Sequence, residues 1–145
     1  MTQWARIEGF TPGAGDVSIY QHTDKQGLWV GCLGDKPIGC IAGVKYNEAY
    51  GFIGLFLVIP EFRGKGYGLE LWKHALEHLS EIPCIGLEAA ESRIKDYSKW
   101  GFSPSSTTTR WEIIVTNQFN PPRNHNLDLC DLSILEGRKI PALAV

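Results

Sequence analysis

The sequence predicts an α/β fold, and the main evidence is one buried strand with the helix that follows it. Residues 51–59 (GFIGLFLVI) are a nearly continuous apolar run, rich in β-branched and aromatic side chains. Such a run is typical of a central strand buried on both faces. Residues 69–79 then place leucines and a tryptophan at helical spacing, which predicts an amphipathic helix. The 145 residues fit one domain over residues 1–119, followed by a linker and tail over residues 120–145.

The remaining elements can be placed in chain order around this pair. Residues 1–16 show no clear pattern. Residues 28–33 and 38–46 are predicted to be strands, and the turn sequence GDKP between them makes them a hairpin. Three further elements follow the helix: a strand over residues 84–89, a short helix over residues 92–100 closed by Gly101, and a strand over residues 107–115.

The last part of the chain looks like the beginning of another unit. A break at residues 120–124 (NPPRN) is typical of a linker. Residues 127–132 then alternate as a strand does, residues 133–136 resemble a helix capping box, and the sequence finishes on the apolar IPALAV. We therefore expect this chain to be a fragment that a second domain follows.

Composition narrows the function classes. The formal net charge of -2 argues against a general nucleic-acid binder. No apolar run is long enough to span a membrane, and no signal peptide opens the chain. The four cysteines lack CxxC spacing and are predicted to be reduced and mostly buried, with Cys32 and Cys40 facing each other across the hairpin. We expect a cytoplasmic protein.

The junction between the central strand and the helix carries most of the functional information. It presents Arg63, Gly64, Lys65, Gly66, Tyr67 and Gly68 in succession. Glycines let a ligand approach the backbone closely, and the free N–H groups of a helix start attract anions. A phosphate or diphosphate site is predicted here. No Lys-Ser or Lys-Thr follows, so this is not a P-loop, and the spacing does not fit a dinucleotide fingerprint. A basic RNA-contact loop is a weaker alternative.

Two motifs resemble the GNAT superfamily of N-acetyltransferases. The stretch VIPEFRGKGYG is similar to the superfamily's acetyl-CoA loop, Arg/Gln-x-x-Gly-x-Gly/Ala, at Arg63, Gly66 and Gly68. The stretch DYSKWGF resembles its Tyr-x-Lys-x-Gly-Phe segment, beginning at Tyr97. The similarity to the superfamily covers residues 28–115. More narrowly, residues 11–102, from TPGAGD to KWGF, are similar to the first domain of bacterial two-domain acetyltransferases.

This resemblance implies a mixed, splayed central β-sheet flanked by helices, here without the usual first strand because few residues precede Leu28. The strands over residues 51–59 and 84–89 would part, and the pantetheine arm of acetyl-CoA would pair with the first of them. Its partners would be Leu57 and Ile59 or, in the alternate register, Val58. The diphosphate would lie on the N–H groups of residues 63–68.

The resemblance also implies a reaction, in which a primary amine attacks the thioester. A backbone N–H near Val58 would stabilise the oxyanion. Tyr97 would be the general acid, although a tyrosine packed on the core is the alternative. Glu88 would be the general base, or a carboxylate that simply meets solvent, and His22 is a weaker candidate. His74 and His78 have the i, i+4 spacing of a zinc pair. They lie on the polar face of the helix with no third ligand, which favours a solvated face, and no metal is expected.

The acceptor is expected to be a small-molecule or protein amine. Tyr46 and Tyr50 would line the acceptor side or be structural, as tyrosines at strand ends usually are. No nucleic acid or membrane partner is expected. A homodimer is left open. The alternative is a non-catalytic acyl-CoA-binding or interaction module, favoured by the altered N-terminus and by Ala90, where many relatives carry an asparagine. A different acyl donor is a further option.

Overall fold

The computed structural model describes residues 1–109, 111, 113 and 114. The chain divides into two units, Met1–Pro104 and Ser105–Val145. The described residues of the second unit form neither helix nor strand. The strand predicted over residues 107–115 is therefore wrong at its described positions, 107–109, 111, 113 and 114. The predicted linker, strand and capping box at residues 120–136 lie outside the described residues.

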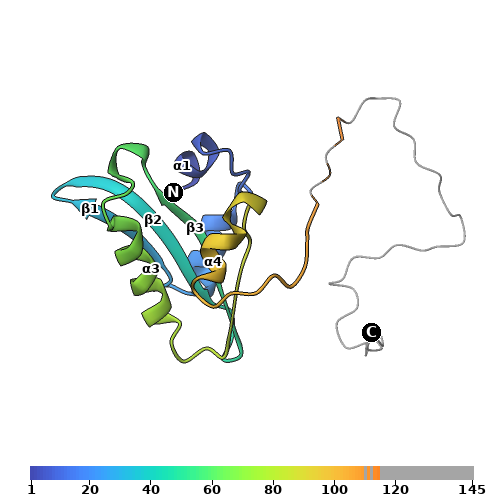
Figure 1. Ribbon diagram of the computed structural model, residues 1–145. Coiled ribbons are helices and arrows are strands. Elements are labelled where there is room, and N and C mark those ends of the chain that lie inside the picture. The colour runs from blue at the N-terminus through green and yellow to red at the C-terminus, as the bar shows by residue number, and fades with distance from the viewer. Residues whose placement is uncertain (110, 112, 115–145) are drawn as a thin grey trace, which may run out of the picture. The chain divides into compact units, whose positions relative to one another are not determined.

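The first unit is built on a mixed sheet of four strands (Figure 1). Neighbouring strands pair in the order β1-β2-β3-β4, the first two pairs antiparallel and the last parallel. The sheet confirms the predicted hairpin, central strand and following strand. The strands are β1 (Leu28–Leu33), β2 (Lys36–Lys45), β3 (Tyr50–Val58) and β4 (Cys84–Leu87).

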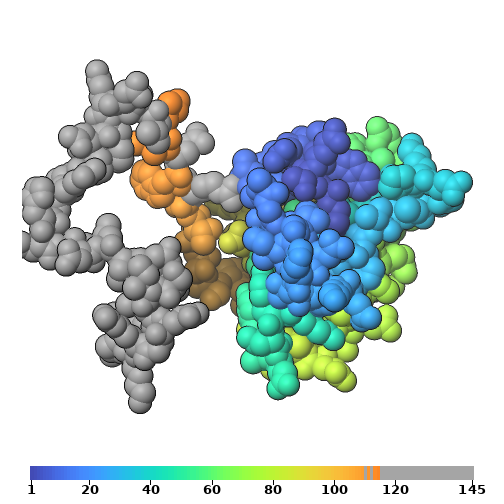
Figure 2. Space-filling model, turned by 180° about the vertical axis from the view of Figure 1, so that it is seen from behind, coloured from blue at the N-terminus to red at the C-terminus, as the bar shows by residue number. Residues whose placement is uncertain are grey.

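Helices cover both faces of this sheet. The predicted amphipathic helix is α3 (Tyr67–His78), which lies on one face. Two short helices that sequence patterns did not reveal, α1 (Thr2–Ile7) and α2 (Asp16–Thr23), cover the other face, where Figure 2 shows the N-terminal residues in blue. Residues 1–27 are fully described and contain no strand, as expected. The helix predicted over residues 92–100 is a 3₁₀ turn, η2 (Glu91–Arg93), that continues into α4 (Ile94–Ser98).

The core lies between α3 and the middle of the sheet. Ile41, Ile53, Trp72, Ala75 and Leu79 are buried together there. The helix approaches β2 closely at Gly43, where an added Cβ would lie 3.2 Å from the Cβ of Ala75. Glycine at this position therefore sets how deeply α3 packs on the sheet.

A β-bulge interrupts the pairing of β3 with β2. Ala42 pairs with Gly54, and Cys40 pairs with Leu57. Leu55 and Phe56 of β3 therefore together oppose one residue of β2, Ile41. Leu55 has φ +48°, the only positive φ of a non-glycine residue in the described part of the chain. A bulge of this kind adds one residue to a strand and bends it.

The sheet opens at this bulge. β4 pairs with β3 only from Tyr50 to Ile53, where Leu87 is the last partner. Beyond Ile53, β3 has no neighbour on that side among the described residues. This arrangement confirms the splayed sheet that the sequence resemblance implies.

Candidate functional site

The loop between β3 and α3 has an open backbone at two of its glycines. Gly64 and Gly66 have φ +71° and +89°, which disfavour any side chain, and an added Cβ on either would meet nothing within 4 Å. Gly66 is also the N-cap of α3. The first amide that bonds back into the loop is that of Glu70, which donates to Gly66.

The amides of residues 64–69 have no partner within the described part of the chain. They include the free N–H groups at the positive end of the α3 dipole. Consecutive main-chain donors that surround open space at a helix start are suited to a phosphate or diphosphate. The glycines that the sequence singled out are therefore brought together with these donors.

The two cations of the loop are engaged in holding it. Arg63 donates from Nε to the carbonyl of Val58 at 2.7 Å, and its guanidinium pairs with Glu8 of the segment after α1 at 2.6 Å. Lys65 donates from Nζ to the carbonyl of Glu61 at 2.9 Å. Their side chains therefore fix the loop, while the backbone presents the free donors.

The open edge of β3 adjoins this loop. The hydrogen bonds at the end of β3 show which of the two predicted registers for the pantetheine arm faces that edge. The amide of Ile59 donates to Ile38 of β2 at 2.9 Å. Because alternate residues of a strand direct their main-chain groups to the same side, Leu57 also faces β2. Val58 faces the open side, where Arg63 reaches its carbonyl. The register in which Leu57 and Ile59 offer their main-chain groups to the pantetheine arm is therefore wrong. The alternate register, through Val58, remains.

Tyr97 lies on α4 with its ring against the core. Its ring centroid is 5.6 Å from that of Trp72 and 6.4 Å from that of Phe102. Trp72 also contacts Phe56, on the open part of β3, at 5.5 Å. Burial raises the pKa of Tyr97, with Arg93 opposing the shift and Asp96 adding to it. A phenol in this position stays protonated at neutral pH, as a general acid requires.

Glu88 directly follows β4 and is exposed, at the level where the two parallel strands part. Tyr20 of α2 comes near the same level, because its hydroxyl would lie 3.4 Å from a Cβ added to Gly54. Burial raises the pKa of Tyr20 to about 12, and Tyr46, Asp16 and Glu88 add to the shift. Tyr20 and Asp16 were missed in the sequence because α2 has no apolar periodicity.

Tyr46 and Tyr50 join Tyr20 on this face of the sheet. Their rings stack with centroids 6.0 Å apart, and the Tyr50 hydroxyl lies over Gly86 of β4. Burial, and then Tyr50 and Asp16, raise the pKa of Tyr46. We call Tyr20, Tyr46 and Tyr50 the tyrosine cluster. The raised pKa values keep the phenols of Tyr20 and Tyr46 protonated at neutral pH.

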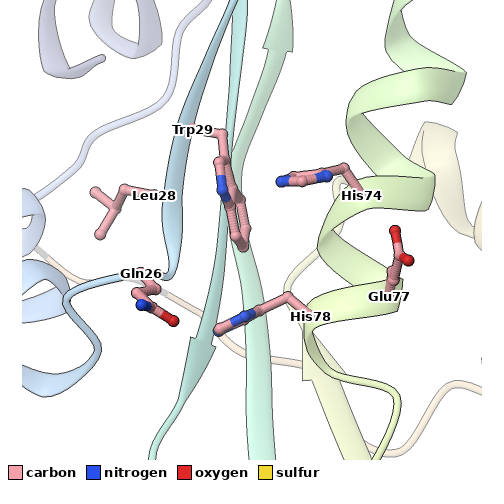
Figure 3. Close-up of a pocket in the computed structure, with 6 residues that line it drawn as sticks. All are labelled: Gln26, Leu28, Trp29, His74, Glu77 and His78. Atoms are coloured by element: carbon pink, nitrogen blue, oxygen red, sulfur yellow. The ribbon is translucent and has the colours of Figure 1, made fainter.

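The histidines of α3 lie away from the loop, beside β1 (Figure 3). The Trp29 ring contacts the rings of both histidines, with centroid distances of 4.9 Å to His74 and 5.1 Å to His78. The three side chains line a cavity of about 470 Å³. His74 is exposed, but His78 is largely buried and donates from Nε2 to Asp24 at 2.7 Å. The solvated-face prediction is therefore wrong for His78. His22 bonds within α2, to the carbonyl of Ser18.

Two other predictions concern metals and cysteines. Within the described residues, no group of three or more His, Cys, Asp or Glu side chains is arranged to hold a metal ion. Cys40 is buried, but Cys32 and Cys84 are exposed, and all three are free. Cys40 pairs with Val30 across the hairpin, not with Cys32. None of the helices in this part of the chain is long and apolar enough to cross a membrane.

Comparisons with known proteins agree with this geometry. The sequence pattern of the Acetyltransferase (GNAT) family matches residues 2–102. A holothin acyltransferase from Pseudoalteromonas sp. (strain SANK 73390) is 32% identical over 122 residues, 84% of this chain and 41% of that protein. An uncharacterized protein of Caenorhabditis elegans, F36G3.2, is 36% identical over 62 residues, 43% of this chain and 20% of that protein. The chain thus spans less than half of either relative.

Solved structures share the fold. Ard1 from Thermoplasma volcanium superposes with a TM-score of 0.62 at 23% identity, covering 72% of this chain and 74% of that one. An acetyltransferase of Trypanosoma brucei gives a TM-score of 0.57 at 20% identity, covering 76% and 87%. At these identities the likeness establishes the architecture alone.

Proposed function

Because the chain belongs to the Acetyltransferase (GNAT) family, we propose that it binds acetyl-CoA and transfers the acetyl group to a primary amine. The observation that carries the proposal is the run of unpaired amides at residues 64–69, directly beside the open edge of β3. A diphosphate on these amides places the pantetheine arm along β3 from Val58 toward the bulge. The thioester then lies where β3 and β4 part.

The reaction needs one proton acceptor and one proton donor. The neutral amine attacks the thioester carbon, so a C–N bond forms and the C–S bond breaks. Glu88 takes the proton that the amine loses, directly or through water. Tyr97 gives its phenolic proton to the leaving thiolate, and a main-chain N–H near Val58 stabilises the oxyanion.

The tyrosine cluster supports an acceptor amine that arrives as its ammonium ion and releases one proton to water to become the neutral nucleophile. It occupies the face of β3 and β4 that α2 covers, next to Asp16 and Glu88. Aromatic faces and carboxylates together attract an ammonium group. The holothin acyltransferase is a relative by similarity, and its name supports acyl transfer as the reaction class.

Calorimetric titration with acetyl-CoA tests the coenzyme site. Gly66→Leu places a side chain in the space that the diphosphate needs and should abolish measurable binding. Gly34→Leu is the matched control, because Gly34 also has a positive φ, +59°, and open space around it, in the β1–β2 turn. Unchanged affinity in Gly66→Leu would show that the diphosphate does not lie on this loop.

Turnover separates an enzyme from a binding module. Release of free thiol from acetyl-CoA with a mixed panel of amines is expected for the parent chain. Tight binding without turnover on any amine would instead support the non-catalytic acyl-CoA-binding or interaction module, for which the short N-terminal helices are the favouring observation.

A further inference from the structure

The β-bulge of β3 adds one residue at the point where the regular pairing with β2 is interrupted. Leu55 is the extra residue, and its φ of +48° is a conformation that leucine keeps only when its surroundings hold it. In a bulge two residues face one, so the added residue falls out of the regular hydrogen-bond pattern. The carbonyl of Leu55 accepts a hydrogen bond from a side-chain group on β2.

That group is the thiol of Cys40 on β2. Its Sγ lies 3.3 Å from the carbonyl oxygen of Leu55 and donates to it. The side chain is 1% exposed, and burial raises its pKa to about 11. The sulfur is therefore a protonated donor at neutral pH. Cys40 is also the buried one of the three free cysteines, since Cys32 and Cys84 are exposed.

The bulge lies at the point that matters for the coenzyme. β4 leaves β3 after Ile53, and Leu55 follows two residues later. The extra residue also reverses the alternation of side chains, so Ile53 and Phe56 both pack toward Trp72. A change at Leu55 would consequently turn the main-chain groups of every residue from Phe56 to Val58.

We propose that Cys40 is a positioning residue, whose thiol holds the Leu55 bulge and so keeps the open stretch of β3 aligned for the acyl-pantetheine arm. This inference rests on the proposed function, because the arm must lie along β3. Cys40 itself does not touch the coenzyme. It acts through the backbone of residues 54–58.

The test compares two ligands on four proteins. The ligands are acetyl-CoA and adenosine 3′-phosphate 5′-diphosphate, which carries the nucleotide of coenzyme A without the arm. The proteins are the parent chain, Cys40→Ala, which removes the donor, Cys40→Ser, which retains one, and Val44→Ala. Val44 is equally buried on the same strand and serves as a core lesion away from the bulge. Circular dichroism establishes that each is folded.

Cys40→Ala is expected to bind acetyl-CoA roughly fivefold more weakly, the equivalent of one lost hydrogen bond, with unchanged affinity for the nucleotide. Cys40→Ser should restore the affinity to within about twofold, and Val44→Ala should leave both affinities at the parent values. Equal acetyl-CoA affinity in Cys40→Ala and the parent would overturn the inference, as would failure of serine to restore it or the same loss in Val44→Ala. A parent that binds neither ligand would overturn the proposed function as well.

Discussion

Removing the carboxylate of Asp24 should destabilise the fold without touching the coenzyme loop. Asp24 lies between α2 and β1, and its carboxylate accepts from His78 Nε2 at 2.7 Å and from the amides of Lys45 and Gln26 at 3.0 Å each. It thereby links the end of β2 to the last turn of α3. Both side chains of the Asp24–His78 pair are largely shielded from water.

The size of the effect follows from these three hydrogen bonds. Each contributes about 0.5–1.5 kcal/mol net, and more when the acceptor is charged. Asp24→Ala should therefore lower the free energy of unfolding by about 2–4 kcal/mol at pH 7. Asp96→Asn is the control, because Asp96 is half exposed and its ion pairs with Arg93 and Lys99 lie at the surface, where each such pair contributes less than about 1 kcal/mol.

The loss should also depend on pH in a defined direction. Burial alone would raise the pKa of Asp24, but the hydrogen bonds from His78, Lys45 and Gln26 lower it overall from 3.8. A carboxyl whose pKa is lower in the folded state contributes its stability above the unfolded pKa. That contribution disappears as the pH falls through the folded pKa.

Urea unfolding followed by circular dichroism, at pH 7 and again below pH 3, measures both quantities. The gap between parent and Asp24→Ala should be full at pH 7 and should narrow in acid. A gap under about 1 kcal/mol at pH 7 would refute the reasoning, and so would one that widens as the pH falls.

Three further predictions concern the site and the core. Tyr97→Phe should lower kcat by about 10²-fold or more while leaving acetyl-CoA affinity unchanged, and equal kcat for both proteins would exclude the acid role. Because burial raises the pKa of Tyr97, the activity of the parent should fall only above about pH 10. Glu8→Gln should weaken acetyl-CoA binding less than about fivefold, because its partner Arg63 is half exposed, and titrations in high salt should erase the difference. Gly43→Val should lower the free energy of unfolding by about 1–3 kcal/mol by forcing α3 off β2, whereas a variant as stable as the parent in urea would show that the helix can move at no cost.

The central elements could be predicted because their local patterns agree with their burial. The apolar run of β3 and the periodicity of α3 identify a buried strand and an amphipathic helix. Gly66 marks the loop between them, since only a glycine readily adopts its φ of +89°. These features depend on residues close together in the chain.

Features created by tertiary contacts were not visible in the sequence. Leu55 resembles any other leucine of an apolar strand, and nothing in the run announces its positive φ. His78 was expected to face solvent, because its partner Asp24 is 54 residues away in sequence. Tyr20 lies on a helix without an apolar stripe, so its place beside Gly54 emerges only from the fold.

A crystal structure of the chain with acetyl-CoA bound tests the central claim most directly. Diphosphate oxygens should lie about 2.7–3.2 Å from main-chain nitrogens of residues 64–69, with the pantetheine arm along the open side of β3 at Val58. Coenzyme found elsewhere, or these amides facing only solvent in a saturated crystal, would contradict it.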